Sequence, residues 1–196
     1  MALGVVELLT ESDADLADFL SETDGPPSGR ALFFLRSACE EVRDYCGWHI
    51  APVVTETIDK LSIGSEGIIL LPSLHVTDVA SVVIDGVTID PAGYEWFKQG
   101  FIETRSPVYR HGFTGFSGGG SPVATVTLTH GYAACPLAVK AAIFDMMETA
   151  YETPTGDVQS VTAPGYGVTF GMQQGGSGLS SGVMSKLSPY RIGGIK

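Results

Sequence analysis

The chain has 196 residues, of which 44% are hydrophobic and only 17% are charged, and it contains 25 glycines and 11 prolines. This length and hydrophobic content allow a buried core but are short of what two full-sized domains need. We therefore expect one domain with extensions. The low charged fraction and the many turn-forming residues predict long loops and a surface that largely faces other proteins.

The formal net charge of -11 is unevenly distributed along the chain. Residues 1–24 carry seven acids and no base, whereas residues 158–196 carry three bases and no acid. The two ends are therefore electrostatically complementary. Proteins that adhere to nucleic acid use Lys and Arg to neutralise phosphates, so this charge balance argues against that class.

The sequence has no apolar run long enough for a membrane span, and its start lacks the basic region and cleavage site of a signal peptide. We therefore expect a protein that is made and kept in the cytosol and has no membrane partner. The three cysteines, Cys39, Cys46 and Cys135, are an odd number without C-x-x-C spacing. They predict buried thiols and neither a disulfide framework nor a zinc site.

The first half of the chain begins with two predicted helices. An acidic N-terminal helical segment occupies residues 1–24, where VELLTESDADLADFLSE places acids between apolar residues at helical spacing. A second helix is expected from about 28 to 47, with Ser28 as its cap. Its apolar residues recur at spacings of three and four and predict one buried stripe: Leu32, Leu35, Cys39, Val42 and Cys46.

From about residue 50 to residue 130 the pattern changes to strands. The segment is rich in β-branched residues and is interrupted by glycine and proline. Asp85-Gly86 predicts the tight turn of a hairpin over residues 79–89, because both central positions of such a turn need positive φ. Further strands are expected within 94–104 and 123–129, with a glycine-rich loop over 106–122 between them.

The last third of the chain predicts a third helix, more strands and an arm. Pro136 opens a helix that runs to about Tyr151. Strands over about 157–171 form a second hairpin that turns at Pro164-Gly165. The helix is expected to bury one stripe: Leu137, Ala141, Phe144 and Met147.

Residues 172–196 begin with a glycine- and serine-rich stretch and end in a short apolar and basic segment. This composition is typical of a flexible linker, so we predict a flexible C-terminal docking arm here. Together the elements predict an α+β fold with a small helical core, β-hairpin insertions and extended terminal arms.

A possible catalytic motif lies at residues 115–119, where GFSGG matches the G-x-S-x-G nucleophile elbow of hydrolases. That motif needs a strand before the serine and a helix after it, but Ser117 lies in a glycine-rich loop that leads into a strand. No two histidines have metal-ligand spacing. We therefore predict no catalytic, cofactor or metal site and no enzymatic activity, with a small serine hydrolase using Ser117 and one of the histidines as the alternative: His49, His75, His111 or His130.

Several segments, taken in order, resemble the head-to-tail adaptor, or head-tail connector, family of long-tailed phages, and especially those that infect actinobacteria. They are spread between residues 44 and 192, and the acidic first segment and the 106–122 loop are not among them. The segments are DYCGWHIAPVVTETI, LPSLHVTDVASVVIDGVTI, VTLTHGYAACPLAVKAAIFDM, and APGYGVTF followed by KLSPYRI.

The resemblance implies a structural virion protein with an adaptor core over residues 28–171. Subunits of this family form a ring, here expected to be a dodecamer, between the portal protein and the stopper or tail-completion protein. The ring would surround a channel for double-stranded phage DNA in the neck of the virion. An acidic total suits such a channel, because fixed negative charge keeps DNA from adhering. A different neck or tail-completion protein is the alternative within this class.

The C-terminal arm is the expected docking element for the portal or a neighbouring subunit. A glycine and serine linker cannot pack by itself, and the apolar residues that follow it would be costly to leave in water. We expect the arm to be mobile in the free subunit and ordered in the neck. The predicted docking residues are Val183, Met184, Lys186, Leu187, Tyr190, Arg191 and Ile192.

Overall fold

The computed structural model confirms the predicted α+β class and groups the chain into two compact units. The helical unit comprises Leu9–Tyr45 and Pro136–Pro189, and the β unit comprises Met1–Leu8, Cys46–Cys135 and Tyr190–Lys196. This grouping differs from a single core over residues 28–171, although the functional division of the chain stays a prediction. The structure describes residues 8–9, 13–23, 29–64, 66–105, 122–152, 160–163, 166–169 and 179–193.

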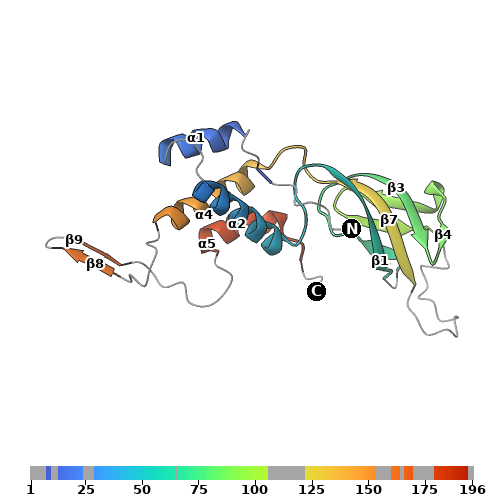
Figure 1. The fold of residues 1–196 in the computed structure, drawn as a ribbon. Helices are drawn as coiled ribbons and strands as arrows, with labels where there is room; N and C mark the ends of the chain where they lie inside the picture. The colour runs from blue at the N-terminus through green and yellow to red at the C-terminus, as the bar shows by residue number, and fades with distance from the viewer. Residues whose placement is uncertain are drawn as a thin grey trace. The chain divides into compact units, whose positions relative to one another are not determined.

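The helical unit is built from four α-helices in its described part, which Figure 1 shows. The helix α2 agrees with the predicted second helix, and its residues Leu35, Cys39 and Val42 are buried as the apolar spacing predicts. A 3-10 turn, Ser188–Tyr190, follows the last helix. The helices are α1 (Ala14–Thr23), α2 (Gly29–Cys46), α4 (Leu137–Glu152) and α5 (Ser181–Leu187).

The buried face of α4 differs from the predicted one. Leu137, the first residue of the predicted stripe, is 77% exposed, and Ala141 and Phe144 are only half-buried. Apolar residues occupy more than one side of this helix, so two registers of helical spacing fit the sequence and only packing selects one. The stripe that the structure buries is Val139, Ala142, Ile143 and Met147.

The N-terminal helix begins later than the string of apolar and acidic residues predicts. Leu8 and Leu9 are buried but not helical, and α1 starts at Ala14. Asp13 explains the boundary, because its Oδ1 accepts hydrogen bonds from the backbone N–H groups of Asp15 and Leu16. A carboxylate that binds these otherwise unpaired amides caps the helix at that residue.

The C-terminal segment has regular structure, which corrects the expectation of a flexible arm for residues 181–190. Ser180 caps α5, since its Oγ accepts a hydrogen bond from the backbone N–H of Val183 at 3.3 Å. Val183 and Leu187 lie on one side of the helix at a spacing of four and are 2% and 0% exposed. A short helix is stable when a neighbouring element covers its apolar stripe, even if the stripe spans only two turns.

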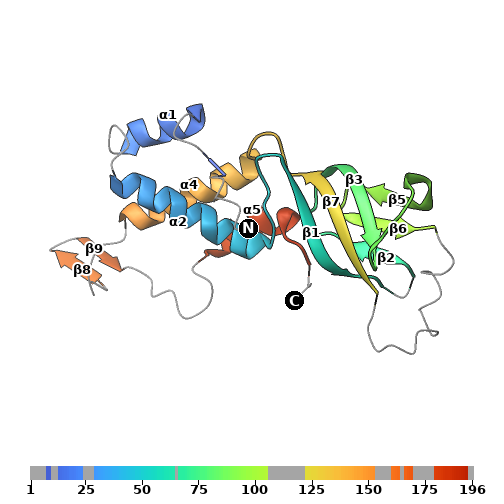
Figure 2. The ribbon, with the colours of Figure 1, turned by 45° about the vertical axis from the view of Figure 1, so that its right-hand side comes forward.

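The β unit contains two antiparallel sheets, whose strands Figure 2 shows. One sheet has the order β1-β7-β3-β4 and the other has the order β2-β6-β5. Their buried residues form one apolar core, with Val82, Val126, Ile69 and Ile102 among its members. The strands are β1 (Val54–Ser62), β2 (Ile68–Leu70), β3 (Val76–Ile84), β4 (Val87–Thr88), β5 (Tyr94–Phe97), β6 (Phe101–Thr104) and β7 (Val123–His130).

Both predicted hairpins are confirmed. In the first, β3 pairs with β4, and Asp85 and Gly86 adopt φ values of 48° and 82°, as a primed two-residue turn requires. In the second, β8 (Ser160–Ala163) pairs antiparallel with β9 (Tyr166–Thr169). The turn residues Pro164 and Gly165 lie outside the described residues, as does the predicted cap Ser28.

The burial of Leu35 leads to a stability prediction with a matched control. Leu35→Ala should lower the free energy of unfolding by about 2–5 kcal/mol, because the substitution leaves a cavity at a buried position. Leu137→Ala removes the same atoms from an exposed position in the same unit, and it should change the free energy of unfolding by less than about 0.5 kcal/mol. Denaturant melts of the two variants would measure the difference, and equal losses would contradict the assigned α2 core.

Candidate interaction surfaces

The residues of the alternative hydrolase site are not brought together in the described part of the chain. Ser117 and His111 lie outside the described residues. Among the residues that the structure describes, no three His, Cys, Asp or Glu side chains are grouped so that they could hold a metal ion. In the same part of the chain, no helix is both long enough and apolar enough to cross a bilayer.

The other three histidines lie in the β unit and make structural contacts. His130 is 1% exposed, and its Nε2 lies 2.8 Å from Oε1 of Glu56. The ring of His49 meets the ring of His130 edge-on, with centroids 5.9 Å apart. His75 stacks on Tyr132 at 4.2 Å. These contacts join β1 and the segments before β1 and β3 to the end of β7 and the residue Tyr132 that follows it.

Two of the predicted docking residues, Val183 and Leu187, are buried inside the helical unit. The premise that they need a partner protein to leave water is therefore wrong. Lys186, between them, makes an ion pair with Asp145 of α4, with Nζ 2.5 Å from Oδ2. Met184 is half-buried. The helix α5 is thus a packed element of the subunit itself, and its docking role stays a prediction.

The last described residues belong to the β unit, where they are bonded to Cys46 and Trp48. Trp48 is buried, and its Nε1 donates a hydrogen bond to the carbonyl oxygen of Tyr190 at 2.6 Å. The backbone N–H of Ile192 donates to the carbonyl of Cys46 at 2.9 Å. Arg191, between these two bonds, is exposed. Three further predicted docking residues are therefore fixed in place within the described structure.

Burial makes Cys46 a poor nucleophile. Removal of the thiol from water raises its pKa to about 11, although the nearby positive charge of Arg191 acts in the opposite direction. The thiolate is the reactive form of cysteine, so this thiol is almost entirely neutral at pH 7. All three cysteines are buried and none is in a disulfide, as the sequence predicts.

Acids at the start of α1 are neutralised within the helical unit. Nζ of Lys140, on α4, lies 2.7 Å from carboxylate oxygens of both Asp13 and Asp15. Burial acts to raise the pKa of Asp13, but hydrogen bonds from Lys140 and from two backbone amides outweigh it and hold that pKa below its usual value of 3.8. The same two carboxylates raise the pKa of Lys140. These ion pairs attach α1 to α4.

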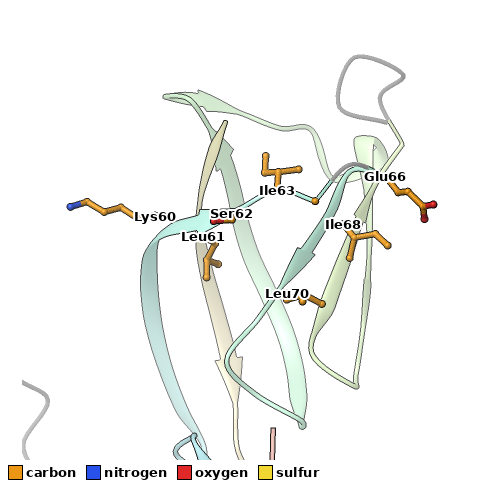
Figure 3. A pocket seen from close by; sticks show the side chains of 8 residues that line it. Lys60, Leu61, Ser62, Ile63, Glu66, Ile68 and Leu70 are labelled. Carbon is orange, nitrogen blue, oxygen red and sulfur yellow. The ribbon is translucent and has the colours of Figure 1, made fainter. Parts of the chain in front are cut away.

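An apolar groove lies at one edge of the β unit, where the chain passes from β1 to β2 (Figure 3). Its volume is about 620 Å³. Leu61, Ile63, Ile68 and Leu70 provide the apolar lining, and Leu70 is 52% exposed. Figure 3 shows the charged ends of Lys60 and Glu66 extending outward on opposite sides. The remaining lining residues are Ser62 and Gly64.

Sequence reasoning missed this groove. The run Ile68-Ile69-Leu70-Leu71 has the composition of a buried strand, and only Ile69 and Leu71 are buried. A continuous apolar run predicts burial on both faces, so the exposure of Leu70 has no signal in the sequence.

No model of a known protein family matches the sequence, and no curated protein matches it. Two solved structures share its fold over its whole length. One is titled as the neck of a native GTA (gene transfer agent) particle computed with C12 symmetry; the likeness covers 100% of this chain and 98% of that one, at 16% identity and a TM-score of 0.57. The other is titled as the neck of an empty GTA particle computed with C6 symmetry, with 100% and 98% coverage, 17% identity and a TM-score of 0.54. At these identities the likeness establishes a shared fold.

The ion pairs of Lys140 lead to a prediction about stability and pH. Lys140→Met should lower the free energy of unfolding by about 1 kcal/mol at pH 7, because it leaves Asp13 and Asp15 without their cation. Lys98→Met, a change at an exposed lysine of the β unit, is the control and should have little effect.

The difference between Lys140→Met and the wild type should depend on pH in a defined way. A carboxyl group whose pKa is lowered by folding stabilises the folded state fully at pH values above its usual pKa of 3.8. A lysine whose pKa is raised by folding does so at pH values below its usual pKa of 10.5. The difference should therefore be constant between these limits, shrink as the pH falls through the lowered pKa of Asp13, and shrink as it rises through the raised pKa of Lys140. Denaturant melts across the pH range would test this, and a difference that grows in acid would contradict it.

Proposed function

We propose that this chain is a structural protein of a phage-like neck, a head-to-tail adaptor that forms a ring between the portal and the stopper or tail-completion protein. The observation that supports the proposal most directly is the shared fold over 100% of this chain and 98% of a chain from a GTA neck. Full coverage matters because both units, and not only one common motif, have counterparts there. The resemblance of several sequence segments to phage adaptors points in the same direction.

Assembly as a homo-oligomeric ring is part of the proposal. The similar chains come from necks computed with C12 and C6 symmetry, in which identical copies surround an axis. A dodecamer is therefore the expected form. In such a ring the net charge of -11 per chain would let double-stranded DNA pass without adhering. The mature protein would reside in the neck of the virion, after assembly in the host cytoplasm.

The portal contact is proposed to involve the C-terminal segment, with a revised role for each residue. Val183 and Leu187 anchor α5 in the helical unit. The residues around them that are less buried would then meet the portal or a neighbouring subunit from an ordered base. Those residues are Met184, Lys186, Tyr190, Arg191 and Ile192. A pre-ordered segment loses less conformational entropy on binding than a flexible arm does.

Ring formation can be tested with the purified chain. Twelve copies of a 20.6 kDa chain have a mass of about 247 kDa. Sedimentation velocity at increasing concentration should show a species near this mass, and electron microscopy of that fraction should show closed rings. A chain that remains a monomer or dimer at every concentration would contradict the proposal, because those are the states expected of a small hydrolase.

The absence of catalysis can be tested at Ser117. Ser117→Ala should leave ring formation and the yield of assembled necks unchanged, because the proposal gives this serine no chemical role. Esterase activity is measured on the same wild-type and variant preparations. Reproducible ester hydrolysis by the wild type that disappears in Ser117→Ala would favour the hydrolase alternative.

A further inference from the structure

The sheet β1-β7-β3-β4 ends in two different exposed apolar features, one at each edge. The groove of Figure 3 adjoins β1, at the first edge. At the opposite edge, β4 is a strand of two residues whose Val87 is 62% exposed. Both features belong to the β unit, so their mutual placement does not depend on the helical unit.

The groove is bordered by strands that have partners on one side only in the described structure. The strand β1 pairs with β7, and β2 pairs with β6. Between them the structure records a single bridge, Ile63 to Ile69. The β1–β7 register shifts between Ile58 and Leu61, and Lys60 has a φ of 61°. The shift is a local bulge in β1, and its pairing with β7 resumes at Leu61 and Ser62.

The opposite edge presents a hairpin tip that is held in one conformation. Val87 and Thr88 pair with Ile84 and Val83, and the turn residues have the φ values of a primed turn. Asp85 also bonds to Val123 of β7: its N–H donates to the carbonyl at 3.1 Å, and its Oδ1 accepts from the N–H at 3.1 Å. All four residues of the tip, 85–88, are exposed. An exposed valine on a fixed hairpin is pre-organised for insertion into an apolar site.

The groove and the tip lie at the same end of the sheet. Val123, the first residue of β7, pairs with Ser62 of β1 on one side and bonds to Asp85 on the other. Ser62 lines the groove, and Asp85 begins the tip. The two features are therefore level with one another on opposite sides of β7.

A cyclic ring of identical chains needs such a pair of features. In a ring with more than two members each interface is head-to-tail, so one patch of a copy contacts a different patch of the next copy. We propose that the β3–β4 hairpin tip of one copy inserts Val87 into the β1–β2 groove of the next, against Leu61, Ile68 and Leu70. This inference rests on the proposed function, because it identifies the contact that closes the ring. The second copy is the occupant that the cyclic necks of similar chains favour.

Of the two exposed charges that border the groove, Lys60 is opposite in sign to Asp85 of the tip and Glu66 has the same sign. Lys60 is exposed at one side of the groove, and Asp85 is exposed two residues before Val87. An opposite-charge pair at the rim of an apolar contact adds little affinity but fixes the orientation in which the two copies meet.

The test uses two charge insertions and one matched control, all at exposed positions, so that folding is preserved. Leu70→Glu damages the groove, and Val87→Glu damages the tip. Val53→Glu places the same charge on an exposed valine of the same unit outside both features. Each of the first two variants should weaken ring formation by about tenfold or more, and Val53→Glu should form rings like the wild type. Thermal melts verify that all three are folded.

A mixing experiment distinguishes this contact from a general effect of added charge. Leu70→Glu chains keep an intact tip, and Val87→Glu chains keep an intact groove. An equimolar mixture should therefore form heterodimers that cannot extend, whereas each variant alone stays monomeric. In a parallel experiment, Leu70→Cys and Val87→Cys chains, mixed and mildly oxidised, should give a disulfide-linked heterodimer in greater yield than either alone. The native cysteines are buried and should not compete.

The outcomes separate this inference from the proposed function. Rings of the wild type together with equal rings of Leu70→Glu and Val87→Glu would overturn the inference and leave the adaptor proposal standing. A mixture that contains only monomers, while the wild type forms rings, would overturn the head-to-tail pairing of these two features. A wild type that never forms rings would contradict the proposed function itself, and the inference would fail with it.

Discussion

The β unit depends on the pairing of β7 along both of its edges. β1 and β3 bind to it on opposite sides over most of its length, and its inner residues Ala124, Val126 and Leu128 are completely buried. A strand that is paired on both sides cannot shift its register without moving its apolar side chains out of the core. The positions of the β1 edge and of the β3–β4 hairpin are therefore both fixed by β7. The relative position of the two edges is therefore the same in every copy of the chain.

The helical unit satisfies its own apolar residues and much of its charge. Val183 and Leu187 of α5 are buried within the subunit, and Lys186 pairs with Asp145 of α4. On the same helix, Lys140 pairs with Asp13 and Asp15. The helix α5 is therefore packed against other residues of its own subunit. In the proposed adaptor role, docking would therefore add contacts to an ordered surface and would not need to fold a disordered one.

The described β unit leaves four large apolar side chains exposed: Val53, Leu70, Val87 and Val123. In the described β unit, Leu70 lies beside the groove and Val87 lies on the hairpin tip. In the proposed ring each copy uses its tip and its groove once, so the same contact would be repeated in every subunit. Each chain would then contact two neighbours, which holds the closed assembly more firmly than a single pair of copies.

The sequence by itself determined the elements of this protein, because their signals are local. Helical spacing located α2, the Asp85-Gly86 pair located the β3–β4 hairpin, and the odd, scattered cysteines indicated buried thiols. The acidic total and the residues around Ser117 also narrowed the classes of function that the chain could have. In each case a few neighbouring residues or the overall composition carry the information.

Tertiary structure alone decided which of several equivalent surfaces is buried. α4 is apolar on more than one side, and only packing chose Val139 and Ile143 over Leu137. The apolar residues of α5 could have been covered by a partner or by the subunit itself, and the latter holds for Val183 and Leu187. The groove that Leu70 lines lies between β1 and β2, which are edge strands of different sheets. The β3–β4 hairpin is level with the groove because Val123 of β7 pairs with Ser62 on one side and bonds to Asp85 on the other. Burial and pairing between distant segments depend on the whole fold, so no local pattern in the sequence can specify them.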